Sequence, residues 1–172
     1  FEERWGEALA GGKRERVYLQ GKVSSAGRGE QRSDHTAAKT RSSVEASLKS
    51  FRTDYLDSVL IHGYDLPEQL DEDGFVDPLG PGNALDELIK MRDEGLIRHI
   101  GIGARHADVI NRATATGEIE LVLTYMEYNL LTQAAAADFF PQCRERDVGI
   151  ILASPHGMGI LTGAEPVDEE VC

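Results

Sequence analysis

The strongest constraint on this chain is the alternation of short apolar runs with longer helical patterns. The apolar runs are rich in Val, Ile and Leu and have the length of buried strands. Strict alternation of strand and helix predicts right-handed βαβ units, and therefore a parallel α/β sheet covered by helices. The predicted strands are Val17–Val23, Ser58–His62, Ile97–Gly103, Ile119–Met126 and Gly149–Ala153.

Helical patterns fill the spaces between these runs, with apolar residues three and four positions apart. Ser42 and Glu45 have capping-box spacing at the start of one helix. Asn83 is a typical N-cap, and Gly95 closes the helix that follows it. The predicted helices are Glu2–Ala10, Ser42–Phe51, the stretch after Asn83, Asp108–Ala115 and Ala135–Asp147.

One connection is unusually long and acidic. Residues Gly63–Gly82 include six acidic side chains and no Lys or Arg. A loop of this length directly after a strand is usually functional or mobile. A solvated surface loop is the simpler interpretation of its charge.

Composition and charge exclude several classes of protein. The chain is 41% hydrophobic, enough to fill a core, and its net charge of −12 argues against a nucleic-acid partner. Cys143 and Cys172 have neither disulfide nor metal-ligand spacing, so we expect buried or idle thiols in a reducing compartment and no metal. The longest uncharged run, Val148–Ala164, is interrupted by Pro155 and four glycines, so no membrane span is expected. These features predict a soluble cytoplasmic protein, and they leave its oligomeric state open.

Two polar residues lie at the carboxyl ends of successive predicted strands. Lys22 closes the first strand and His62 closes the second. Parallel α/β folds place their sites at this edge, so the two side chains should face the same opening at the carboxyl ends of the strands, called the mouth below. Taken alone, Lys22 is more simply a solvated charge, and His62 is as often a structural hydrogen-bonding group. Their joint placement makes a functional interpretation equally good.

Other candidate motifs are weaker. The Gly-rich stretch from Ser154 to Gly159 is either a backbone cradle for phosphates or a plain turn. Gly101–Ala104 lacks the third glycine of a dinucleotide-binding fingerprint. His99 and His106 are expected to be surface groups.

Five segments, in the same order, resemble segments of the aldo-keto reductase family. The first resembles the helix that follows the family's catalytic tyrosine, and the second resembles the family's strand that ends in the catalytic histidine. Together they are spread over nearly the whole chain, from Glu2 to Gly163. The segments are Glu2–Gly11, Thr53–His62, Asp86–Gly103, Glu127–Leu131 and Ser154–Gly163.

The resemblance implies a (β/α)8 TIM barrel that binds NAD or NADP across its carboxyl face. It also implies an oxidoreductase that transfers hydride between nicotinamide and a carbonyl or alcohol carbon. The family's tetrad is Asp, Tyr, Lys and His, and here Lys22 and His62 stand at the last two positions. An ammonium group near the tyrosine lowers the phenol pKa, and the imidazole orients the substrate oxygen.

The resemblance also implies further contacts. Gly63 and Tyr64 stand where a bulky residue borders the substrate, and they are expected substrate residues. The expected cofactor residues depart from the common pattern of the family. Gly103 and Ala104 replace Ser-Asn, Tyr125 replaces Gln, and His156 replaces the leucine after Ser154, which keeps its place in the pyrophosphate loop.

Within the family, the pattern resembles most the sugar-dehydrogenase branch, which includes L-galactose dehydrogenase and the aldose 1-dehydrogenases. This implies oxidation of a small sugar substrate at C1 to a lactone. One alternative is a general aldehyde or ketone reductase. Another is a non-catalytic module of the same fold that binds a nucleotide or a protein partner.

The length agrees with only part of such a barrel. An eight-stranded barrel usually needs at least about 200 residues, and this chain has 172. The resemblance places strands 2 to 6 of the barrel in a single partial domain, residues 1–172. The tetrad Asp and Tyr would precede Phe1. We therefore expect the chain to belong to a longer protein, or to be inactive on its own.

Overall fold

The computed structural model describes residues 2–23 and 33–163. Strands and helices alternate along them as predicted. The strands are β1 (Gln20–Val23), β2 (Leu56–His62), β3 (Ile97–Gly103), β4 (Leu121–Tyr125) and β5 (Gly149–Ala153). The helices are α1 (Glu2–Ala8), α2 (Ala37–Phe51), α3 (Ala84–Asp93), α4 (Ala107–Ala115), α5 (Ala134–Asp138) and α6 (Phe140–Glu145), with short 3-10 helices η1 (Arg14–Arg16), η2 (Pro67–Asp71) and η3 (Gly157–Thr162).

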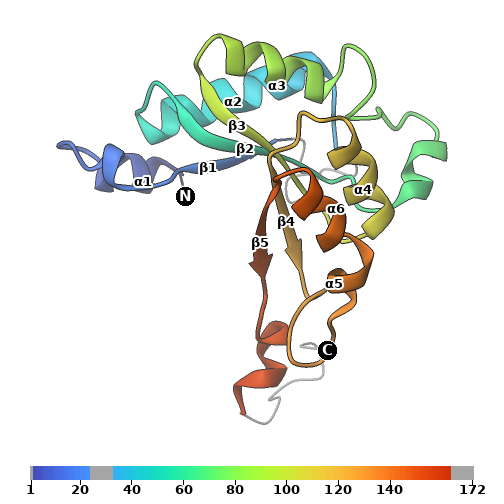
Figure 1. Cartoon of the computed structure of the whole chain (residues 1–172). Helices are drawn as coiled ribbons and strands as arrows, with labels where there is room; N and C mark the ends of the chain where they lie inside the picture. Colours follow the sequence, from blue (N-terminus) through green and yellow to red (C-terminus); the bar gives the residue numbers. More distant parts are fainter. Residues whose placement is uncertain (1, 24–32, 164–172) are drawn as a thin grey trace.

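The five strands form one parallel sheet in the order β1-β2-β3-β4-β5. The sheet is strongly twisted, and α2 and α3 lie side by side over β1 to β3, while α6 packs on β5 and α4 lies beside α6 (Figure 1). A doubly wound sheet reverses its strand order at a switch point, whereas a barrel wall continues in one direction. The uninterrupted order of the described strands is therefore that of a barrel wall.

Side chains alternate between the two faces of each strand. In β2, Val59 and Ile61 belong to the apolar core beneath the helices. Leu60 projects to the opposite face, where it is also fully buried. A Cβ at Gly101 of β3 would lie 2.4 Å from Leu60 Cδ2 and 2.6 Å from the carbonyl oxygen of Leu121. Gly101 is therefore needed for packing on the inner face, and not for a dinucleotide loop.

Several predicted boundaries are wrong for local reasons. The helix predicted from Ser42 begins at Ala37, and Thr36 is its N-cap, with Oγ1 accepting from Lys39 N at 3.4 Å. Ser42 instead donates to the Lys39 carbonyl from inside the helix. Asn83 is the N-cap residue of α3 as predicted, but its side-chain amide donates to the Asp77 carbonyl.

The predicted helix Ala135–Asp147 is divided into α5 and α6 at Phe139, whose φ is −144°. Pro141 lies in the first turn of α6. Proline has no N–H to donate and clashes with the preceding turn, so a continuous helix is broken here. The strands are off by two or three residues at several ends: β1 begins at Gln20, β2 already at Leu56, and β4 spans only Leu121–Tyr125.

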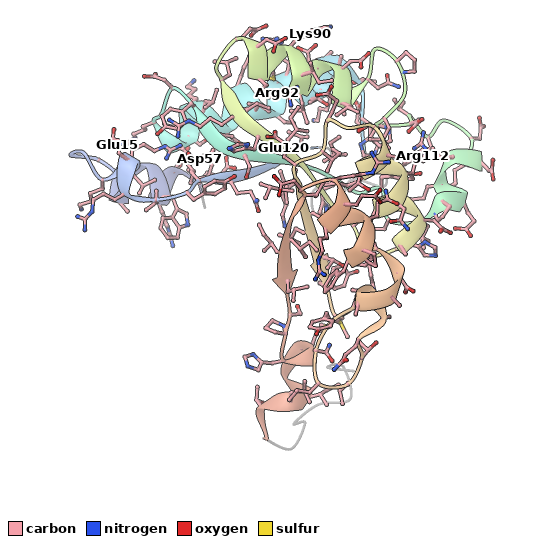
Figure 2. The ribbon with its side chains drawn as sticks, in the orientation of Figure 1. Glu15, Asp57, Lys90, Arg92, Arg112 and Glu120 are labelled. Atoms are coloured by element: carbon pink, nitrogen blue, oxygen red, sulfur yellow. The ribbon has the colours of Figure 1, made fainter. Side chains whose placement is uncertain are left out.

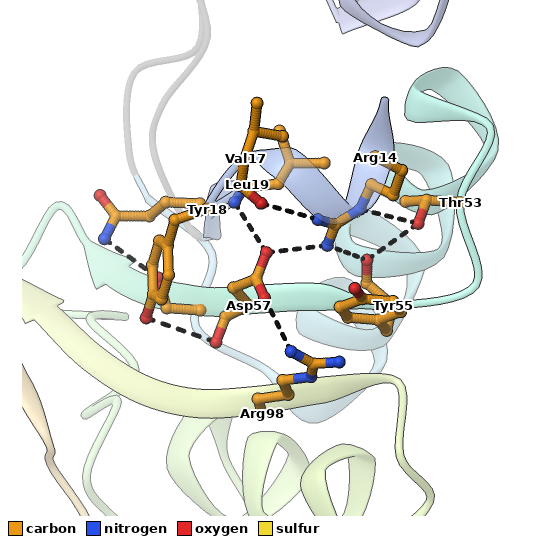
Figure 3. A network of polar contacts seen from close by, with 10 residues as sticks. Arg14, Val17, Tyr18, Leu19, Thr53, Tyr55, Asp57 and Arg98 are labelled. Carbon is orange, nitrogen blue, oxygen red and sulfur yellow. Dashed lines mark hydrogen bonds and ion pairs between the residues drawn. The ribbon is translucent and has the colours of Figure 1, made fainter. Parts of the chain in front are cut away.

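At the amino edge of the sheet, one carboxylate joins three segments. Asp57 accepts from the Leu19 N–H at 2.8 Å, from Arg14 Nη2 at 2.9 Å and from Arg98 Nη1 at 3.2 Å. The Arg14 and Arg98 guanidinium carbons lie 4.1 and 4.0 Å from the ring centroid of Tyr55 (Figure 3). The network ties the segment before β1 to β2 and β3, and so helps to fix their register.

Candidate active site

Lys22 and His62 lie on the same face at the carboxyl edge of the sheet. Lys22 pairs in register with Leu60, two residues before His62, so both side chains point away from the helices. Burial is the main cause that lowers the pKa of His62, the nearby Lys22 ammonium lowers it further, and Asp65 opposes the shift. The predicted pair is thus brought together, with the imidazole neutral near pH 7.

The imidazole of His62 lies over a glycine. His62 pairs in register with Gly103, and a Cβ at Gly103 would lie 3.0 Å from Cδ2 of the ring. The Nδ1 atom is buried and has no hydrogen-bond partner among the described residues. Gly103 therefore leaves room for the imidazole, which covers it.

One predicted substrate residue, Tyr64, is buried and does not lie at the carboxyl edge of the sheet. Gly63 has φ of 84°, a left-handed turn that follows the strand directly. Tyr64 is consequently only 1% exposed and belongs to the core, with its ring 5.8 Å from that of Phe75. Its hydroxyl accepts from Arg112 Nη1 at 3.1 Å. The expected substrate contact of Tyr64 is corrected to an anchor of the loop.

The same loop is held by an ion pair with α4. Both Nη groups of Arg112 donate to the Asp77 carboxylate, at 2.6 and 2.9 Å, and Figure 2 shows Arg112 on α4. Burial alone would raise the pKa of Asp77, but the hydrogen bonds from Arg112 lower it below its usual value. The loop that follows His62 is therefore fixed at two of its residues.

The expected cofactor residues divide into two groups. Ala104 is buried: its N–H donates to the Leu123 carbonyl at 3.1 Å and its methyl group packs in the core. Its side chain is therefore not at the mouth, which corrects the expected contact. Tyr125 is 38% exposed at the end of β4, and His156 is exposed after β5. These two can meet a ligand in the described arrangement.

The Gly-rich loop after β5 has the hydrogen bonds of a turn. Ser154 has φ of 52°, and its carbonyl accepts from the Gly157 N–H at 3.0 Å. The N–H groups of Gly159 and Leu161 both donate to the His156 carbonyl at 3.1 Å. These three amides are already engaged, so this conformation favours the plain turn over a preformed phosphate cradle.

An open cleft of about 610 Å³ lies beside Tyr125. Inside it, Arg105 Nε donates to the Glu127 carboxylate, and the guanidinium carbon lies 5.7 Å from the centroid of the Tyr125 ring. Of the predicted site residues, the cleft includes only Tyr125. The lining residues are Asp65, Leu66, Arg105, His106, Ala107, Tyr125, Glu127, Asp138 and Phe139.

Sequence reasoning missed the pair Arg105 and Glu127. The two residues are 22 positions apart and show no periodicity; the one available signal is that each closely follows a strand. His106, expected as a surface group, is half exposed, caps α4 through Nδ1 and also lines the cleft. His99 is half exposed, as expected, and pairs with Glu120 at 2.9 Å.

The described residues also show where metal-binding groups, free thiols and long apolar helices are found or absent. Within residues 2–23 and 33–163, no three His, Cys, Asp or Glu side chains are grouped to hold a metal ion. Cys143 is a buried free thiol whose pKa is raised by burial, and Cys172 lies outside the described residues. None of the helices in this part combines the length and apolarity that a membrane crossing requires.

The strand order and the helices along the outer face define part of a (β/α)8 barrel, and the candidate residues lie at the carboxyl edge, where such barrels have their sites. The chain belongs to the aldo/keto reductase family, whose sequence model matches residues 2–172.

Individual relatives agree with this assignment. The chain is 33% identical over 133 residues to a D-threo-aldose 1-dehydrogenase from Pseudomonas sp, which covers 77% of this chain and 38% of that protein. It is 29% identical over 147 residues to L-galactose dehydrogenase of Arabidopsis thaliana, covering 84% of this chain and 43% of that protein. A solved structure described as an aldo-keto reductase from Pseudomonas aeruginosa matches with a TM-score of 0.70 and 28% identity, covering 88% of this chain and 52% of that one. The chain thus spans less than half the length of these curated relatives.

Proposed function

We propose that the natural protein is an NAD(P)-dependent oxidoreductase that oxidises an aldose at C1 to the lactone. The observation that carries the proposal is the placement of Lys22 and His62 on one face at the carboxyl edge. Aldo-keto reductases use NAD(P), and two relatives of this chain are named as sugar dehydrogenases. The names of these relatives favour sugar oxidation over general carbonyl reduction.

In this proposal, His62 orients the sugar and Lys22 assists the transfer of its proton. When bound, oxidised nicotinamide would supply the acceptor for the hydride from C1. The hydroxyl proton at C1 passes to the family's tyrosine, and Lys22 favours the phenolate form that accepts it. Neutral His62 hydrogen-bonds the C1 oxygen and holds it in position.

The residues at the mouth fit the nicotinamide end of the cofactor. Gly103 adds no side chain beside the His62 ring, where the nicotinamide end is expected. Ser154 and His156 lie at the neighbouring strand end, where the family's pyrophosphate loop is expected. Since the amides of that loop are engaged internally, cofactor binding there would require side chains or a rearranged turn.

The proposal is tested on the natural, full-length protein with NAD⁺ or NADP⁺ and a panel of neutral aldoses. Nicotinamide reduction with formation of a lactone is expected. Lys22→Met and His62→Gln should each lower kcat by roughly 10²- to 10⁴-fold, while Lys90→Met, an exposed lysine on α3, should leave it unchanged. Turnover of simple aldehydes alone would identify a general reductase, and cofactor binding without any turnover would identify a non-catalytic module.

A further inference from the structure

The cleft beside Tyr125 contains a charged pair that the proposed hydride transfer does not use. Arg105 at the end of β3 and Glu127 after β4 are joined by a hydrogen bond. The Arg105 side chain is 50% exposed and that of Glu127 is 19% exposed. An arginine has five N–H donors, so the exposed half of the guanidinium retains donors for a ligand.

The residue types in this cleft suit a hydroxyl-rich ligand. Vicinal hydroxyl groups both donate and accept, and they match a guanidinium beside a carboxylate through charge-assisted hydrogen bonds. The half-exposed ring of Tyr125 provides an apolar surface for the C–H face of a sugar. The volume of about 610 Å³ lies within the range of small-molecule sites.

The charge of the cleft disfavours anionic ligands. Glu127 already balances Arg105, while Asp65 and Asp138 add carboxylates to the lining and His106 faces the same space. A carboxylate or phosphate on the ligand would meet like charge here. A neutral ligand avoids this cost.

The cleft is electrostatically connected to the proposed reaction centre. Asp65, which lines the cleft, lies close enough to His62 to oppose the lowering of the imidazole pKa. Tyr125 is on the same face of the sheet as Gly103, and the inner faces of β3 and β4 pair in register at Gly103 and Leu123. A ligand in the cleft therefore lies next to the mouth that His62 borders.

We infer that this cleft is the subsite for the hydroxyl groups of a neutral aldose that lie away from C1. Arg105 and Glu127 form its hydrogen-bonding pair, and Tyr125 forms its stacking surface. The choice of substrate class rests on the function proposed above. The subsite determines specificity: it accepts neutral sugars and rejects uronic acids.

Kinetics of single variants test the subsite in the full-length protein. Arg105→Ala should raise KM for the preferred neutral aldose about tenfold or more, with kcat changed less than about twofold, because a charge-assisted hydrogen bond to bound sugar is lost. Arg144→Ala, an exposed arginine on α6 outside this cleft, is the matched control and should leave both constants unchanged.

Charge discrimination provides a signature that loss of folding alone does not produce. Glu127→Gln should leave Arg105 without its counter-charge, and so raise kcat/KM for a uronic acid relative to the matching neutral aldose about tenfold. Arg105→Ala should shift the same ratio in the opposite direction. Ratios unchanged in both variants would overturn the subsite.

Ligand-observed NMR with the neutral aldose separates this inference from the proposed function. If the wild-type protein binds the sugar without oxidising it, and Arg105→Ala abolishes the signal, the subsite stands and the proposed reaction fails. If the sugar is oxidised while Arg105→Ala and Glu127→Gln keep the wild-type KM, the reaction stands and the subsite is wrong. Absence of both binding and turnover would overturn both.

Discussion

The imidazole of His62 occupies the space that a side chain at Gly103 would need. The two residues pair across β2 and β3, and a Cβ at Gly103 would lie 3.0 Å from Cδ2 of the ring. At that distance the ring must give way by a few tenths of an ångström. Glycine here thus acts on the position of the candidate catalytic group, and its backbone needs no unusual φ.

Gly103→Ala should reduce activity more than it reduces stability. The added methyl group displaces the His62 ring from the substrate oxygen, and misplacement of a catalytic group by a fraction of an ångström costs roughly threefold to tenfold in kcat/KM. Steady-state kinetics and thermal unfolding of the full-length protein measure the two effects side by side.

The control for this substitution is Gly149→Ala in β5. A Cβ at Gly149 would also lie 3.0 Å from a neighbour, but that neighbour is Cδ2 of Leu121 at the other end of the strands. The control should show a similar loss of stability with kcat/KM kept. Equal losses of activity in both variants would contradict the role assigned to Gly103.

The amino-edge network predicts unequal contributions from its two arginines. The Arg14 side chain is 11% exposed where it meets Asp57, whereas that of Arg98 is 57% exposed. Arg14→Gln leaves the buried carboxylate with only the Leu19 amide and the exposed Arg98 guanidinium as partners, and should cost about 3 kcal/mol of unfolding free energy. Arg98→Gln removes a solvated partner and should cost less than about 1 kcal/mol. Urea unfolding of the full-length protein measures both, and equal costs would disprove this account.

The fold was predictable because its signals are local. Runs of Val, Ile and Leu identify strands, and alternation with helices dictates a parallel sheet. The start of α2 was missed because its first turn has no apolar periodicity; the real cap is Thr36, whose N–H and hydroxyl both donate to Asp34. The break between α5 and α6 at Phe139 is caused by Pro141. It was missed because the apolar spacing continues across it.

The placement of the candidate site residues was predictable only for residues that the ends of the strands position. Lys22 and His62 come together because parallel strands end at one edge, which the sequence reveals. Tyr64 goes to the core because the left-handed turn at Gly63 directs the chain back under the loop. Arg105 and Glu127 come from separate loops, and their contact depends on the conformations of both loops. No sequence pattern predicts such a contact.

The clamp between Arg112 and the loop that follows His62 should control the order of that loop. Arg112→Met removes two hydrogen bonds to Asp77 and one to Tyr64, with an expected cost of about 1–2 kcal/mol since the pair is partly exposed. Limited proteolysis should cut within residues 63–82 several times faster than in the wild type.

The control for the clamp is Arg92→Met. Arg92 pairs with Glu118 at 2.5 Å and is similarly exposed, but it lies on α3 away from the loop, as its label in Figure 2 shows. It should reduce stability slightly and leave the cutting rate of the loop unchanged. Equal cutting rates of the loop in Arg112→Met and Arg92→Met would show that Arg112 does not hold it.

A buried histidine beneath the same loop predicts a pH-dependent stability. His35 is fully buried, with its ring 5.2 Å from that of Phe75. Burial is the main cause that lowers the pKa of both His35 and His62 below the ordinary value of 6.5. The unfolded chain therefore binds more protons than the folded one just below that pH, and stability rises with pH there.

Acidification should accordingly weaken the fold before any carboxylate is protonated. The stability that depends on neutral histidines is complete above the unfolded pKa of 6.5 and is lost as pH falls through it towards the folded values. Urea unfolding at several values from about pH 7.5 to about pH 5.5 should show a falling midpoint. His35→Phe keeps an aromatic ring against Phe75 without a proton site, so its midpoint should fall less steeply. His156→Gln changes an exposed histidine and should keep the wild-type slope; the same slope in all three proteins would rule out His35 as a source of the pH dependence.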